Sequence, residues 1–206
     1  MRPHPETSAL GAILAGGASR RFGAPKALAM VGGSAMVERV RIALVEAGLT
    51  PVLVGTRREL EMVDLPRRED GVEGCGPLSG VRAALLWARE LGLRGAICVA
   101  CDLPLLAAPL LRELRERGES SAARAVAPSG RGGLPEPLCA WYAVSALPEI
   151  ERRMGAGELR MRDLVAALEA EQMPLNEVSR FGDPARLFLN VNTPAERDAA
   201  ERLASS

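Results

Sequence analysis

Short apolar runs alternate with longer amphipathic segments along most of the chain. The apolar runs are continuous rather than alternating, which is typical of strands buried on both faces of a parallel sheet. The expected strands lie at 9–15, 51–55, 95–101, 122–127, 138–144 and 186–190. The expected helices lie at 34–48, 78–91, 107–117, 147–153, 162–171 and 194–203. This alternation predicts an α/β fold with a mostly parallel central sheet covered by helices.

Length and charge limit the class of protein. No repeat or low-complexity linker interrupts the 206 residues, so we expect a single domain at 1–206. The formal net charge is zero, which argues against a broad surface for nucleic acid or anionic membrane. No apolar stretch approaches the roughly 20 residues of a membrane span, and the first ten residues lack the apolar run of a signal peptide. We expect a cytoplasmic protein without nucleic-acid or membrane partners.

Two cysteines resemble a metal or redox motif but are not expected to act as one. Cys98 and Cys101 have the C-x-x-C spacing. They lie on the predicted strand at 95–101, where residues three apart point to opposite faces of the sheet. We therefore predict that the two sulfur atoms do not converge.

The first predicted strand ends in a glycine-rich segment, LAGGASRRFGAPK, at 14–26. Glycines let the backbone approach a ligand closely, and Arg21 and Lys26 are suitable donors to phosphate oxygens. Lys26 is the only lysine in the chain. The segment is neither a P-loop, since Lys26 does not directly follow a glycine, nor a G-x-G-x-x-G fingerprint. We interpret it as a different phosphate-binding loop, the alternative being an ordinary glycine turn with solvated arginines.

An acidic residue follows the most apolar predicted strand. Asp102 stands at its carboxyl end, where ligands bind in open parallel sheets. One carboxylate, together with triphosphate oxygens and waters, is a common way to hold Mg²⁺. The alternative is that Asp102 caps the helix that begins near 107 or the turn at Pro104.

Two further segments are candidates for ligand contact. A second glycine-rich loop at 70–80 enters a helix, and its alternative is a plain helix entry. Asn190 and Asn192, two of only three asparagines, stand two apart on the predicted strand at 186–190 and the residues after it. Residues at this spacing face the same side of a strand, so both amides can hold one ligand. We expect Thr193 to cap the last helix, with Pro194 at its first position.

The order of these motifs resembles the molybdenum cofactor guanylyltransferase family. The motifs are the glycine loop, then Gly-Pro-Leu-Ser-Gly at 76–80, Cys-Asp-Leu-Pro at 101–104, Glu-Pro-Leu at 136–138 and Asn-Val-Asn-Thr-Pro at 190–194. The resemblance spans about residues 9–203. It implies a Rossmann-like three-layer fold of the nucleotide-diphospho-sugar transferase type. It also implies Mg²⁺-dependent transfer of GMP from GTP to the molybdopterin cofactor, with release of pyrophosphate.

The same resemblance assigns roles to residues. A nucleotide-binding part would span about 8–105 and an acceptor-binding part about 106–206. The nucleotide contacts implied are Leu14, Ala15, Gly16, Gly17, Ser19, Lys26, Thr56, Asp70 and Asp102, with Asp102 also the metal ligand. The acceptor contacts implied are Glu136, Pro137, Leu138, Asn190 and Asn192. Thr56 departs from the family, which often has Asn there, and a hydroxyl lacks the paired reach of an amide.

The predicted mechanism is an in-line attack by the acceptor's phosphate on the α-phosphorus of GTP. Lys26 and Arg21 are expected to stabilise the leaving pyrophosphate, and no general base is required because the nucleophile is already ionised. Transient contact with cofactor-insertion enzymes or chaperones is expected for the product. The alternatives are cytidylyl transfer to the same pterin, transfer to another phosphorylated acceptor, and a non-catalytic nucleotide- or cofactor-binding accessory protein.

Overall fold

The computed structural model describes residues 9–15, 26–55, 63–71 and 74–204. Within these ranges, a seven-stranded sheet has the order β5-β4-β1-β6-β8-β7-β9. Its strands are β1 (Ala9–Leu14), β4 (Thr50–Val54), β5 (Arg67–Arg68), β6 (Gly95–Ala100), β7 (Ala125–Pro128), β8 (Cys139–Ala143) and β9 (Glu171–Met173). The strand β8 pairs antiparallel with both β6 and β7, and the other pairings described in this sheet are parallel. The predicted mostly parallel sheet is confirmed.

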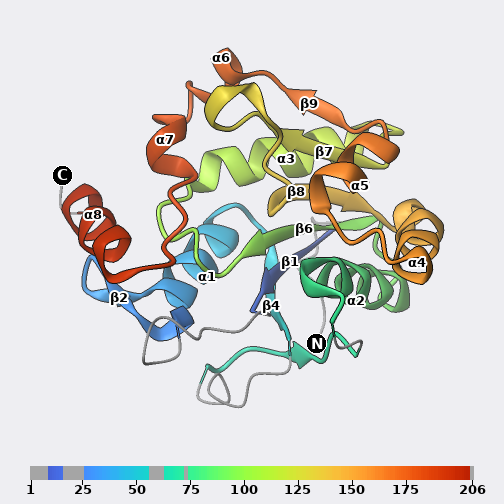
Figure 1. Cartoon of the computed structure of the whole chain (residues 1–206), viewed down its shortest axis with the longest axis horizontal. Helices are drawn as coiled ribbons and strands as arrows, with labels where there is room; N and C mark the ends of the chain where they lie inside the picture. The colour runs from blue at the N-terminus through green and yellow to red at the C-terminus, as the bar shows by residue number, and fades with distance from the viewer. Residues whose placement is uncertain (1–8, 16–25, 56–62, 72–73, 205–206) are drawn as a thin grey trace.

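Helices cover both faces of the sheet, so the molecule has three layers (Figure 1). The longer helices are α1 (Met36–Glu46), α2 (Gly76–Glu90), α3 (Ala108–Ser120), α4 (Leu147–Ala156), α5 (Met161–Ala167) and α8 (Pro194–Ala204). The short helical segments are η1 (Lys26–Leu28), η3 (Arg131–Gly133), η4 (Val144–Ala146), α6 (Leu175–Val178) and α7 (Pro184–Leu187). One hydrophobic cluster joins α1 and α3 to one face, and a second joins α2, α4 and α5 to the other.

The central strands β1 and β6 are apolar on both faces because both faces are covered. Every residue of β1 and of β6 is buried. Cys98 belongs to the cluster beneath α2, whereas Cys101 packs against the cluster beneath α1 and α3. The two sulfur atoms therefore face different layers of the molecule. The prediction that the two sulfur atoms do not converge is confirmed.

A small hairpin before α1 was not predicted. The strands β2 (Met30–Val31) and β3 (Ser34–Ala35) pair antiparallel across Gly32 and Gly33. Both glycines have positive φ, 58° and 76°, as a two-residue type I′ turn requires. The helix consequently begins at Met36 rather than at 34.

Two predicted elements were wrong in the second half of the chain. The expected strand at 186–190 is replaced by the helix α7, because Asp183 caps it by accepting a 2.9 Å hydrogen bond from the Ala185 amide and Pro184 occupies its first position. The expected helix at 162–171 ends at Ala167. Glu169 then adopts a φ of 50°, which turns the chain out of the helix and back into the edge strand β9.

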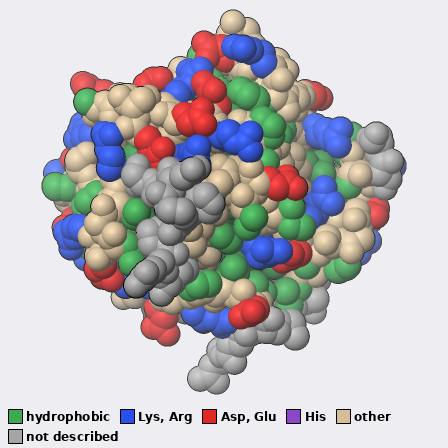
Figure 2. All heavy atoms as spheres, turned by 180° about the vertical axis from the view of Figure 1, so that it is seen from behind, with side chains coloured by type: hydrophobic (Ala, Val, Ile, Leu, Met, Phe, Trp, Pro, Cys, Tyr) green, Lys and Arg blue, Asp and Glu red, His purple; other side chains and the backbone are tan. Residues whose placement is uncertain are grey.

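The surface carries both signs of charge. On the face seen from behind, basic side chains lie among aspartates and glutamates (Figure 2). This mixture agrees with the formal net charge of zero. Among the described helices, none combines the length and apolar character needed to cross a membrane.

Candidate active site

The candidate site lies where the central parallel strands end. Beyond β1, the Ala15 amide donates a 2.8 Å hydrogen bond to the Val54 carbonyl of β4. The Cys101 amide, beyond β6, donates a 3.2 Å bond to the Leu14 carbonyl. These bonds continue the sheet ladder past the strands and hold the first residues of two connecting segments side by side. The predicted meeting of the glycine-rich segment with Asp102 at this edge is therefore supported for its described residues, Leu14, Ala15 and Lys26.

Lys26 and Asp102 form an ion pair at this edge. The Lys26 Nζ contacts Asp102 Oδ2, and the two side chains are only 14% and 16% exposed. The second carboxylate oxygen, Asp102 Oδ1, is buried and has no hydrogen-bond partner among the described residues. Asp102 also does not cap α3, since the cap residue there is Ala107 and no side chain bonds to that helix end. The structure thus excludes Asp102 as the cap of α3, and its ligand-binding role stays a prediction.

The two asparagines complete this cluster from the C-terminal part of the chain. Lys26 Nζ also donates to Asn192 Oδ1, and Asn192 Nδ2 donates to Asn190 Oδ1 over 2.7 Å. The amide of Val191, between them, donates a 3.0 Å bond to the main-chain carbonyl of Asp102. Residues 188–193 form no strand, so the predicted strand geometry was wrong, but both amides do reach the same place.

Thr193 caps α8 as predicted. Its Oγ1 accepts a 3.3 Å hydrogen bond from the Glu196 amide, and it contacts Glu196 Oε2 at 3.1 Å. Glu196 Oε2 also accepts a 2.7 Å bond from the Asn192 amide. The sequence had not pointed to Glu196, although Thr193-Pro-Ala-Glu196 has the S/T-x-x-E spacing of a capping box.

A pocket adjoins the cluster and is open to solvent. Its free space, open solvent included, is about 540 Å³. It is lined by Leu14, Val54, Asp70, Gly76, Pro77, Gly80, Ala100, Cys101, Asp102 and Leu138. A methyl group at Gly80 would lie 3.2 Å from Leu14 Cδ2, so this glycine lets Leu14 and α2 pack closely beside the pocket. A mostly apolar lining with a few polar groups is typical of small-molecule sites.

The loop at 70–80 brings a second carboxylate to the pocket. Asp70 lines it, and Ser79 Oγ lies 3.3 Å from Asp70 Oδ2 and 2.7 Å from the Gly76 carbonyl. Ser79 is buried, and the sequence had not indicated a role for it. Its spacing from Gly76 and Gly80 places all three on one side of α2, which is the signal that could have indicated a role.

The segment at 136–138 divides between two environments. Leu138 lines the pocket, and its carbonyl accepts a 2.9 Å bond from the Ala100 amide. The Pro137 carbonyl accepts a 2.8 Å bond from the buried Tyr142 hydroxyl. Glu136 packs against Gly130, where an added methyl group would lie 2.1 Å from Glu136 Oε1. Burial raises the pKa of Glu136, while the positive charge of Arg162 opposes that rise.

Several predicted residues lie outside the described residues: Gly16, Gly17, Ser19, Arg21 and Thr56. Their roles stay predictions. Within the described part of the chain, no three His, Cys, Asp or Glu side chains gather as a metal site. A cation bound at this site would therefore take few ligands from the described part of the protein, and the rest from the substrate and from water. The buried Asp102 Oδ1, which has no partner in the described part of the chain, fits that requirement, because Mg²⁺ prefers oxygen ligands and commonly takes only one or two carboxylates.

Comparison with known proteins gives consistent matches over most of the chain. Residues 11–172 match the family model of the MobA-like NTP transferase domain. A protein of Opitutus terrae named "Probable molybdenum cofactor guanylyltransferase" is 37% identical over 197 residues, 93% of this chain and 94% of that protein. A protein of the same name from Pelotomaculum thermopropionicum is 33% identical over 199 residues, 96% of this chain and 94% of that protein.

Solved structures agree with the fold. Molybdopterin-guanine dinucleotide biosynthesis protein A from Archaeoglobus fulgidus has a TM-score of 0.79 at 28% identity, covering 94% of this chain and 97% of that one. The 2-C-methyl-D-erythritol 4-phosphate cytidylyltransferase from Thermus thermophilus has a TM-score of 0.64 at 16% identity, covering 96% and 100%. At that identity the second likeness concerns the fold alone. The predicted nucleotidyltransferase type of α/β fold is confirmed.

Proposed function

The chain belongs to the MobA-like NTP transferase domain family, and from this premise we propose that it transfers GMP from MgGTP to the molybdopterin cofactor and releases pyrophosphate. It is an enzyme, a nucleotidyltransferase, as the sequence predicted. The names of its relatives agree with guanylyl transfer in molybdenum cofactor biosynthesis. The observation that carries the proposal is the convergence of Lys26, Asp102 and Asn192 beside a pocket at the carboxyl edge of the sheet.

In the proposed reaction, an oxygen of the acceptor's terminal phosphate attacks the α-phosphorus of GTP. A new P–O bond forms as the bond to the β-phosphate oxygen breaks, and the electron pair leaves with pyrophosphate. The protein's contribution is to position the reactants and to neutralise charge. Lys26, together with Arg21, stabilises the departing pyrophosphate. No side chain has to remove a proton, because the attacking phosphate is already ionised.

The charges of Lys26 and Asp102 suit ligands of the opposite signs. Here they compensate each other in a mostly buried pair. Asp102 would hold Mg²⁺, which, when bound, supplies positive charge to the phosphate oxygens. The Lys26 ammonium would then bind phosphate oxygens. A triphosphate with its bound cation is a ligand that offers both a positive charge for Asp102 and anionic oxygens for Lys26.

The pocket brings the two proposed halves of the site together. Leu14, Val54 and Asp70 come from the part proposed to bind nucleotide, at about 8–105, and Leu138 comes from the part proposed to bind the acceptor, at about 106–206. Asn190 and Asn192 are proposed to face the acceptor as well as Lys26. The cytoplasmic location and the transient contacts with cofactor-insertion enzymes or chaperones stay predictions of the sequence.

Calorimetric titration with GTP, CTP, ATP and UTP, each with Mg²⁺, tests the proposal directly. We expect selective binding of GTP that is weakened by Asp102→Ala. Asp163→Ala, which removes an exposed carboxylate on α5 away from the pocket, is the matched control and should bind GTP as the unchanged protein does. Preferred binding of CTP would instead assign cytidylyl transfer.

A second measurement separates an enzyme from a silent binder. Protein, MgGTP and molybdopterin cofactor are mixed, and released pyrophosphate is measured. Release that depends on both substrates supports the proposed reaction. GTP binding without any release would leave only the accessory binding function.

A further inference from the structure

A small hydrophobic cluster, separate from the two main ones, includes residues from the segments that carry Lys26, Asp102 and the asparagines. Its buried members are Val31, Met36, Leu105, Val191 and Ala200. Val31 follows Lys26 by five residues, Leu105 follows Asp102 by three, and Val191 stands between the two asparagines. The segments that carry Lys26, Asp102 and the two asparagines therefore each contribute an apolar side chain to this cluster. Ala200 adds α8, which lies beside β2 (Figure 1).

The main chain between the two asparagines is held from two sides. It belongs to no described strand or helix. The Val191 amide donates to the Asp102 carbonyl over 3.0 Å, and the Asn192 amide donates to Glu196 Oε2 over 2.7 Å. Of the two, the bond from Asn192 fixes the residue whose side chain contacts Lys26.

Glu196 reaches this amide from the first turn of α8. The carboxylate lies 3.1 Å from Thr193 Oγ1, which in turn accepts a hydrogen bond from the Glu196 amide. The hydrogen bond from the Asn192 amide is the largest cause of a lowered pKa for Glu196, and the positive charge of Lys26 contributes as well. The carboxylate is therefore charged at neutral pH and lies within the field of Lys26.

We propose that Glu196 is a positioning residue for the transfer reaction: by holding the Asn192 main chain, it aims Asn192 Oδ1 at Lys26 and so sets the lysine for the phosphates. Glu196 is not part of the described pocket lining, so its effect passes through Asn192. This inference rests on the proposed function, since it assigns Lys26 to the phosphates of the nucleotide.

Three variants distinguish positioning from ordinary helix capping. Glu196→Ala removes the acceptor for the Asn192 amide. Glu196→Gln keeps one carbonyl oxygen that can accept both the Asn192 amide and the Thr193 hydroxyl. Thr193→Ala removes the other half of the cap but leaves Glu196 beside Asn192. For each variant, kcat, KM for GTP and the melting temperature are measured.

We expect Glu196→Ala to lower kcat by about tenfold or more with a smaller change in KM, because a misplaced catalytic group costs rate. Glu196→Gln should recover kcat to within about threefold of the unchanged enzyme, since the positioning bond survives. Thr193→Ala should lower the melting temperature about as much as Glu196→Ala while keeping kcat nearly unchanged. Equal kcat in Glu196→Ala and Thr193→Ala would overturn the proposal and leave only a cap.

Hydrogen exchange gives a readout that does not depend on activity. The Asn192 amide should exchange faster in Glu196→Ala than in Thr193→Ala or the unchanged protein. Should Glu196→Ala fail to fold, Glu196→Asp takes its place, because the shorter side chain keeps the charge but withdraws the oxygen from the Asn192 amide. That variant should show the same loss of kcat and the same faster exchange.

The two proposals fail in different ways. An unchanged enzyme that releases no pyrophosphate would refute the proposed function. An active enzyme whose Asn192 exchange is unaltered in Glu196→Ala, or in Glu196→Asp, would refute the positioning role alone.

Discussion

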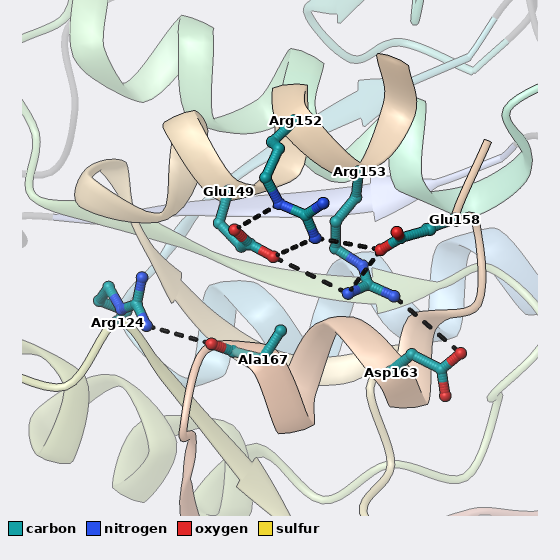
Figure 3. Close-up of polar contacts among 7 residues, drawn as sticks. All are labelled: Arg124, Glu149, Arg152, Arg153, Glu158, Asp163 and Ala167. Carbon is teal, nitrogen blue, oxygen red and sulfur yellow. Dashed lines mark hydrogen bonds and ion pairs between the residues drawn. The ribbon is translucent and has the colours of Figure 1, made fainter. Parts of the chain in front are cut away.

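The ion pair of Lys26 and Asp102 and the arginine network of α4 and α5 are both partly hidden clusters of charge. In the network, Arg152 donates to Glu149 over 2.9 and 3.0 Å and to Glu158 over 3.0 Å (Figure 3). Arg153, whose side chain is 8% exposed, lies 3.2 Å from Glu158 and 4.0 Å from Asp163. Every carboxylate of this network therefore faces at least one guanidinium.

The candidate active site differs from this network because one of its carboxylate oxygens has no partner among the described residues. Asp102 has one oxygen paired with Lys26 and one buried oxygen without a partner among the described residues. In the network, Arg153 Nε is also buried without a hydrogen-bond partner among the described residues. The terminal nitrogens of the same guanidinium, however, form ion pairs with carboxylates. The network thus compensates its own charges and stabilises the contact between helices, whereas the site retains an acceptor for a ligand. This difference can be tested by removing one charge from each cluster.

The largest effect is expected for Lys26→Ala. It removes the cation proposed to stabilise the leaving pyrophosphate, so kcat should fall about 100-fold or more, as for loss of a preorganised electrostatic donor. Pyrophosphate release under saturating GTP measures this. Arg153→Ala is the contrasting variant and should keep kcat. A Lys26→Ala enzyme with kcat within about twofold of the unchanged one would contradict the role of Lys26.

A smaller effect, on stability instead of rate, is expected for Arg153→Ala. The side chain is buried and its carboxylates are partly exposed, so the free energy of unfolding should fall by about 2 kcal/mol, less than for a fully buried pair. Arg152→Ala is the matched control on the same helix. Its side chain is 52% exposed, so solvent screens its ion pairs and its loss should change the free energy of unfolding much less. Urea unfolding measures both variants, and an Arg152 effect as large as that of Arg153 would contradict the comparison.

The smallest expected effect is a dependence of the melting temperature on pH. Hydrogen bonds from Arg152 lower the pKa of both Glu149 and Glu158 from the ordinary value of 4.5. A carboxyl group whose pKa is lower in the folded than in the unfolded protein stabilises the folded state at pH values above its unfolded-state pKa. This stabilisation is lost as the pH falls through its folded-state pKa. The difference in melting temperature between the unchanged protein and Arg152→Ala should therefore shrink below about pH 4.5. A difference that stays constant down to about pH 3 would exclude this linkage.

The sequence was sufficient where local pattern decides the structure. The strands β1 and β6 were evident because continuous apolar runs of that length are buried on both faces. It misled at 186–190, where apolar Leu187, Phe188 and Leu189 suggested a strand. The cap at Asp183 and Pro184 starts a helix there instead, a start signal that carried more weight than the apolar run.

For the site, the edge of the sheet was predictable and the contacts were not. Ligands bind at the carboxyl ends of parallel strands, so Lys26 and Asp102 could be expected near each other. Nothing local indicates that Asn192 contacts Lys26, because that contact depends on how α8 packs against β2 and on a cluster drawn from separate segments. The bond between the Asn192 amide and Glu196 is local, and the capping-box spacing at 193–196 was the signal that could have indicated it. Sequence spacing reports only which residues share an element.

The contact between Lys26 and Asn192 joins residues 166 positions apart. A ribosome adding 5–20 residues per second places about 10–30 s between the two. Within that interval Asp102 is added 76 residues after Lys26, yet the lysine still lacks its amide partner. The proposed site is therefore completed only late in the synthesis of the chain.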